Sequence, residues 1–237
     1  MKRPFLPPAF FMLFALWPMY MMHRILDDAG FQSTVFKSPA LQAEFHSTAA
    51  DVYDLYNAEG LSARAALTEE MRLAHVYDNL FLCFYGLFLA FFAIQGFRLT
   101  RMWHFLFMVL LAVLAACADL IENGAIVGIT RTLDAGESDF SLLLKRLAFF
   151  TWLKWLSLAM YFGVLARFFR HAAQWGNLPK WAGIFLRWAC LIVCFVTFGA
   201  FMTRSARWEN WMSQAFVLIF AGVFVFSLFF KRKISAV

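Results

Sequence analysis

The sequence predicts an all-α integral membrane protein, a six-transmembrane-helix bundle with both termini cytoplasmic. Hydrophobic residues make up 62% of the 237 residues and charged residues only 15%, far from the average soluble domain. Lys and Arg lie at the ends of long apolar runs and form no single patch. The net charge of +6 therefore indicates membrane orientation and contact with membrane lipids, and no nucleic-acid partner is expected.

Apolar runs of about 20 residues, enough to span roughly 30 Å of hydrocarbon, recur along the chain. They cover about 5–22, 73–97, 102–128, 144–166, 181–203 and 210–230. The first run resembles a signal peptide, but residues 19–24 lack the small side chains that signal peptidase requires, so we expect an uncleaved anchor. The second helix is expected to begin at Thr68, whose hydroxyl can cap free amides. We expect one membrane domain over 1–237.

Charge distribution predicts the orientation of these helices. The N-terminus, the turn at 98–101, the loop at 167–180 and the C-terminus contain no Asp or Glu. Their basic residues are Lys2, Arg3, Arg98, Arg101, Arg167, Arg170, Lys180, Lys231, Arg232 and Lys233. The positive-inside rule places these segments in the cytoplasm, which is the orientation expected of this multi-pass membrane protein.

This orientation leaves residues 24–72 outside the cytoplasm. Within this segment, the stretch from Thr48 to Gly60 predicts a short helix with a polar cap at its start and glycine at its end. Apolar side chains recur on one face of that helix. We expect it to cover the bundle or lie on the outer membrane surface, with Tyr53 and Tyr56 near the headgroups. A solvated connector is the alternative.

Ionisable side chains cost about 2.5–3.5 kcal/mol each at the centre of a membrane helix, so each needs a partner or a function. Three predicted helices carry polar residues at i, i+3 or i+4 spacing, which places each set on one helical face. The sets are His75, Asp78 and Asn79 in the second helix, Asp119, Glu122 and Asn123 in the third, and Thr151 and Lys154 in the fourth. A further polar group, Glu209, Asn210 and Gln214, begins the sixth helix.

These sets are expected at similar depth. At a rise of 1.5 Å per residue, Asp78, Glu122 and Lys154 lie roughly 8–15 Å below the outer surface. Short connections favour neighbouring helices, so we expect one buried site that opens to the outer side. Asp119 and Glu122 would repel each other there, so one holds a proton unless Lys154 or another cation neutralises it.

The polar sets predict an acid–base site. The candidate catalytic residues are Asp119, Glu122, Lys154 and Asp78, and the candidate substrate-binding residues are Asn79, Asn123, Thr151 and His75. The leading hypothesis is an enzyme that acts on a lipid or isoprenoid-like amphiphile. One alternative is a structural or assembly subunit whose buried ion pairs only fix helix packing, and another is a proton-coupled transporter. A single histidine among carboxylates is a weak metal signal, so no metal is assigned. The sequence names no cofactor.

Three segments also resemble a pattern found in uncharacterised bacterial multi-pass membrane proteins, and this resemblance implies a location in the bacterial inner (plasma) membrane. They are Ala-His-Val-Tyr-Asp-Asn-Leu-Phe from residue 74, Ala-Asp-Leu-Ile-Glu-Asn from residue 118 and Thr-Trp-Leu-Lys-Trp from residue 151. The shared pattern is an early Asp, then Asp-x-x-Glu-Asn, then Thr-x-x-Lys. The resemblance covers about 70–160 and implies no activity; it points to Asp78, Asp119, Glu122, Asn123 and Lys154.

Overall fold

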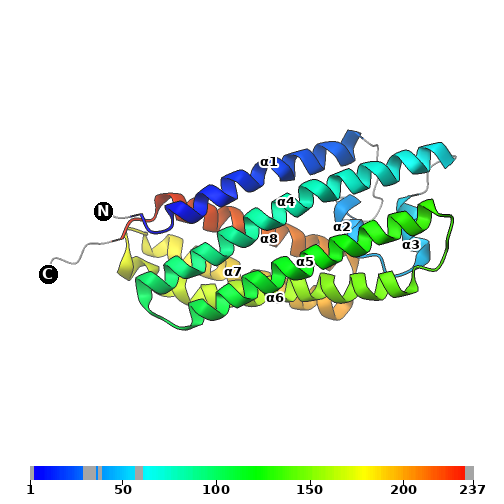
Figure 1. The fold of residues 1–237 in the computed structure, drawn as a ribbon. Coiled ribbons are helices and arrows are strands. Elements are labelled where there is room, and N and C mark those ends of the chain that lie inside the picture. Colours follow the sequence, from blue (N-terminus) through cyan, green and yellow to red (C-terminus); the bar gives the residue numbers. More distant parts are fainter. Residues whose placement is uncertain (1–2, 29–35, 37–38, 57–60, 233–237) are drawn as a thin grey trace. The chain divides into compact units, whose positions relative to one another are not determined.

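The computed structural model describes residues 3–28, 36, 39–56 and 61–232, and these residues fold into α-helices (Figure 1). The helices are α1 (Leu6–Asp28), α2 (Pro39–Glu44), α3 (Ala49–Leu55), α4 (Leu61–Thr100), α5 (His104–Asp134), α6 (Ser141–Trp175), α7 (Lys180–Thr203) and α8 (Ala206–Phe229). In this described part of the chain, α1 and α4–α8 are the six helices long and apolar enough to cross a membrane. The six predicted helices are thereby confirmed. A helix satisfies every backbone amide within its own segment, as hydrocarbon requires.

The predicted start of the second membrane helix is wrong. Helix α4 begins at Leu61, so Thr68 lies inside the helix and does not cap it. The Ala-rich stretch before Thr68 favours helix and extends α4 backwards. The Thr68 hydroxyl instead donates a hydrogen bond to Asp134 Oδ1 at 2.7 Å, which joins the first half of α4 to the end of α5.

The short helix expected after Thr48 is present as α3. Thr48 Oγ1 accepts a hydrogen bond from the Asp51 amide, and the Asp51 carboxylate accepts one from the Thr48 amide. This reciprocal pair is a capping box. The predicted stop at Gly60 lies outside the described residues.

The chain divides into two compact units. Unit 1 consists of Met1–Leu13, Phe84–Ala115 and Trp155–Val237, and unit 2 consists of Phe14–Cys83 and Ala116–Lys154. All eight residues predicted to form the site belong to unit 2, whereas Glu209 belongs to unit 1. Each unit has its own buried core.

Aromatic rings form the core of unit 1. The Phe5 ring stacks on Phe92 with 4.5 Å between centroids, and Phe105 meets Phe168 edge to face at 5.6 Å. These are the geometries that aromatic pairs prefer. Phe5 also contacts Phe230, which follows the end of α8. The first turn of α1 and the last turn of α8 therefore lie side by side (Figure 1).

Unit 2 is closed at one end by α2 and α3, which lie beside the last turns of α5 and the first turns of α6 (Figure 1). Val52, Leu55 and Tyr56 of this segment are buried in the same apolar cluster as Ile129 of α5 and Leu144 of α6. The solvated-connector alternative is therefore wrong for α3. Burial of the Tyr56 ring also contradicts its predicted place among lipid headgroups.

Close helix packing in unit 1 gives a test of this fold. A Cβ atom at Gly96 would lie 2.3 Å from the ring of Phe105, which is fully buried against Phe168. Gly96→Ala is expected to lower the free energy of unfolding by about 1–3 kcal/mol, because the ring has no room to move aside. Thermal melting of the purified protein in detergent measures this change.

Gly124→Ala is the matched control, because a Cβ atom there meets nothing within 4 Å. Alanine at that helical position is expected to stabilise the protein by about 0.5–1 kcal/mol. Equal melting temperatures for the two variants would contradict the packing described at Gly96.

Candidate functional site

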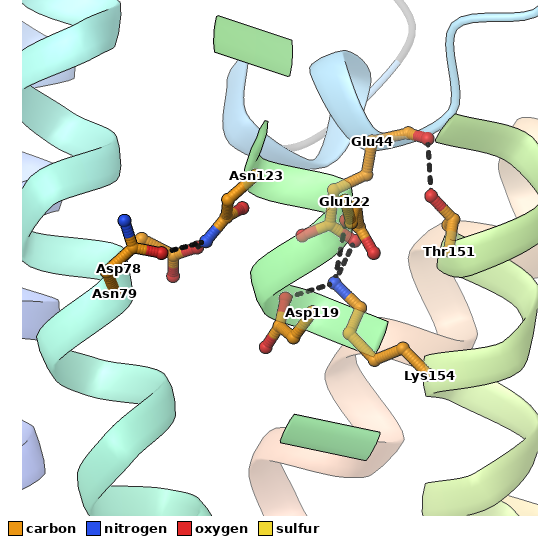
Figure 2. Close-up of polar contacts among 8 residues, drawn as sticks. All are labelled: Glu44, Asp78, Asn79, Asp119, Glu122, Asn123, Thr151 and Lys154. Atoms are coloured by element: carbon orange, nitrogen blue, oxygen red, sulfur yellow. Dashed lines mark hydrogen bonds and ion pairs between the residues drawn. The ribbon is translucent and has the colours of Figure 1, made fainter. Parts of the chain in front are cut away.

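A single ammonium group lies at the centre of unit 2. Lys154 Nζ donates hydrogen bonds to Glu122 Oε1 at 2.8 Å and to Asp119 Oδ1 at 3.1 Å. Its third neighbour is Glu44 Oε2 at 3.0 Å. An ammonium has three N–H donors, and this geometry gives each one its own carboxylate oxygen (Figure 2). Lys154 lies on α6, Asp119 and Glu122 on α5, and Glu44 on α2, so this carboxylate–ammonium cluster joins three helices.

The spacing on α5 explains why two carboxylates reach one cation. Asp119 and Glu122 are separated by one helical turn and lie on the same face, as positions i and i+3 do. Both are buried, as is Lys154. A buried charge is tolerated only with partners that satisfy it, so these three side chains depend on one another.

Next to this cluster, Asn123 joins α5 to α4. Asn123 Nδ2 donates to Asp78 Oδ2 at 2.6 Å and to Asn79 Oδ1 at 3.1 Å (Figure 2). Asp78 therefore accepts from an amide, and its carboxylate is not among the three that contact Lys154. The polar residues of α5 that share one predicted face therefore have two sets of partners. Asp119 and Glu122 contact Lys154, whereas Asn123 contacts α4.

Helix α2 covers the cluster and is held by two contacts of one residue. The Glu44 carboxylate pairs with Lys154, and the Glu44 carbonyl accepts a hydrogen bond from Thr151 Oγ1 at 3.1 Å (Figure 2). The Glu44 side chain retains 20% of its exposure, whereas that of Glu122 has none. Burial raises the pKa of Glu44 above its ordinary value, and the attraction of Lys154 opposes this rise.

The cluster carries more potential negative charge than positive. Three carboxylates surround one ammonium, so full ionisation would leave an excess of two negative charges in a buried site. In a low-dielectric environment such an excess is relieved by bound protons. Glu122 Oε2 is buried and makes no hydrogen bond within the described part of the chain, so a proton can bind to this oxygen. The cluster is therefore suited to take up and release protons.

His75 lies on α4 and is buried, with Nδ1 2.8 Å from the Met71 carbonyl. Met71 lies one turn earlier in the same helix, and this contact fixes the orientation of the His75 ring. Among the residues that the structure describes, no group of three or more His, Cys, Asp or Glu side chains is arranged to hold a metal ion.

The structure brings together Asp119, Glu122 and Lys154, as their spacing predicts, and adds Glu44, which sequence reasoning missed. Proline at the start of α2 is typical of a first helical position, but six residues are too few to show a helical period. Thr151, predicted as a substrate-binding residue, donates a hydrogen bond to the main chain of α2.

These features define a polytopic α-helical membrane protein with a buried cluster of ionisable side chains. Comparisons with protein-family models, curated proteins and solved structures found no match to this chain.

The cluster predicts coupled effects on stability. Lys154→Met removes the cation that pairs with Glu122 and Asp119, and is expected to cost about 3–5 kcal/mol of unfolding free energy. Glu44→Gln is expected to cost less, because two carboxylates still contact Lys154. The double variant should lose less than the sum of the single losses, as measured by thermal melting. Strictly additive losses would contradict direct pairing of Glu44 with Lys154.

His46, between α2 and α3, predicts a pH dependence. Burial lowers the pKa of His46 to about 4, although nearby Asp51 favours the charged ring. The unfolded chain binds this proton near pH 6.5, so the folded state loses stability as pH falls from about 6.5 towards 4. The loss is roughly 3 kcal/mol. Thermal melts across this range should therefore differ between the wild type and His46→Gln.

His23→Gln is the control, because His23 is exposed on α1. The His23→Gln profile should follow that of the wild type. The His46→Gln variant should lose less stability as pH falls from about 6.5 towards 4, because it has no buried ring to protonate. Parallel profiles over the whole range would count against the buried, neutral state of His46.

Proposed function

We propose that the protein is an enzyme of the bacterial inner membrane that acts on a lipid or isoprenoid-like amphiphile by acid–base chemistry in unit 2. The observation that carries this proposal is the carboxylate–ammonium cluster, in which Lys154 contacts three carboxylates and is outnumbered by them. A cluster whose only task is packing gains nothing from surplus carboxylates, whereas a proton donor or acceptor needs them.

In this proposal Glu122 transfers the proton. Its Oε1 is held by Lys154, which fixes the carboxyl group, while Oε2 makes no hydrogen bond in the described part of the chain. Asp119 keeps the ammonium charged and in place. Lys154 then stabilises negative charge that develops on a substrate oxygen, because an ammonium in a dry site acts far more strongly than in water.

Helix α2 controls access to the cluster. Glu44 is the least buried of the three carboxylates around Lys154, and its helix has only six residues. An anionic or polarised oxygen of the substrate replaces the Glu44 carboxylate and occupies the N–H donor that it leaves. The rest of the substrate stays apolar, because the surrounding helices are apolar enough to lie in hydrocarbon. With the basic ends in the cytoplasm, the cluster opens towards the outer leaflet.

Of the alternatives, a structural or assembly role is supported by one observation, which is that every N–H donor of Lys154 is already paired. A proton-coupled transporter needs acidic groups along the whole path. Unit 1 contains a single acidic residue, Glu209, which lies in the first turn of α8. The enzyme and the structural subunit are therefore the two functions to separate.

Glu122→Gln is the decisive variant, because glutamine keeps the shape of the side chain and removes its acid–base capacity. Glu122→Gln and Lys154→Met, each as a single variant in place of the wild type, are expected to deplete one lipid product of the cell or to accumulate its precursor. Lipid profiling by mass spectrometry measures the change, and immunoblotting of membranes measures protein abundance in the same cells.

Glu209→Gln is the matched control, since Glu209 is a buried membrane acid of unit 1. An unchanged lipid profile for Glu122→Gln at normal abundance would overturn the enzyme proposal. Reduced abundance with unchanged lipids in every variant supports the structural role instead.

A further inference from the structure

Unit 1 contains a basic cleft that the proposed function does not use. The cleft has a volume of about 310 Å³ and is lined by Arg3, Arg98 and Arg232, with Gln95, Pro7 and Leu99 among its other walls. Arg3 precedes α1, Arg98 lies in the last turn of α4, and Arg232 follows α8. Three segments that are distant in the sequence thus bring three guanidinium groups to one cleft.

The backbone that carries these arginines is held in place. Arg232 forms an isolated antiparallel bridge with Gly176, and the adjacent Lys231 amide donates to Asn177 Oδ1 at 2.7 Å. The Arg3 carbonyl accepts a hydrogen bond from the Leu6 amide at 3.3 Å. Arg98 belongs to a continuous helix. Little ordering of the main chain is therefore needed when a ligand enters, which favours binding.

No acidic side chain of unit 1 balances this charge. Glu209, the single acidic residue of the unit, lies in the first turn of α8, whereas Arg232 follows the end of that helix. The remainder of α8 separates the two by roughly 30 Å. Among the described residues, none of the three arginines forms an ion pair with a carboxylate. The cleft therefore holds positive charge that is free for an anion.

We propose that this cleft binds the phosphate of an anionic phospholipid headgroup. Guanidinium groups match phosphate geometry and donate paired hydrogen bonds to it. The cleft lies at the ends of membrane-spanning helices, which is where headgroups lie, and Pro7 and Leu99 give it apolar walls against which a glycerol backbone can pack. This inference is independent of the chemistry in unit 2.

The test measures lipid binding to the full-length protein in detergent by native mass spectrometry. Phosphatidylglycerol, phosphatidylcholine and inorganic phosphate are titrated separately. Saturable binding of phosphatidylglycerol is expected, with much weaker binding of phosphatidylcholine. Arg98→Gln is expected to weaken phosphatidylglycerol binding about tenfold, because a charge-assisted contact is lost. Adding Arg232→Gln should weaken it further, and Arg98→Lys should retain part of the affinity.

Arg170→Gln is the control, because it removes an exposed basic residue of unit 1 that does not line the cleft. Thermal melting establishes that each variant is folded. Equal weakening by Arg170→Gln, or equal affinity for phosphatidylcholine, would overturn the proposal. Saturable binding of inorganic phosphate that phosphatidylglycerol does not displace would assign the cleft to a free anion and also overturn it.

Discussion

The arrangement of helices in unit 2 depends on one buried ammonium. Lys154 loses its hydration when α6 packs, and this loss is compensated only if acceptors from other helices reach Nζ. Two of them come from α5 and the third from α2, so the same contacts that stabilise the charge also fix which faces of three helices meet. Apolar packing alone would leave rotation about each helix axis poorly specified.

The same cluster combines a fixed ion pair with groups that can bind or release protons. Asp119 and Lys154 form a fixed pair, while the further carboxylates of Glu122 and Glu44 make the net charge of the site depend on bound protons. This surplus has a cost in a low-dielectric environment, which is typical of functional sites and unusual in sites that only stabilise a fold. Lys154 fixes one carboxylate oxygen of Glu122, and the other oxygen makes no hydrogen bond within the described part of the chain. The contact that positions Glu122 therefore differs from the atom that can bind a proton.

Much of unit 2 could be predicted because helical spacing is a local property. Positions i, i+3 and i+4 place Asp119, Glu122 and Asn123 on one face, whatever α5 contacts. Glu44 could not be found in this way, since α2 is shorter than two turns and its contact with Thr151 spans 107 residues of sequence. The pairing of Asp78 with Asn123 could not be predicted either, because helical spacing within α4 and within α5 does not determine which side chains of the two helices meet.

The hydrogen bond from Thr151 to the carbonyl of Glu44 concerns the main chain of α2, whereas the ion pair with Lys154 concerns the side chain. The main-chain contact that holds α2 in place therefore does not depend on which side chain stands at position 44. Asp, Gln or Ser at position 44 would keep the main-chain carbonyl that accepts the hydrogen bond from Thr151. A change at this single position therefore alters the chemical group beside Lys154 without a change in the main-chain contact that holds α2.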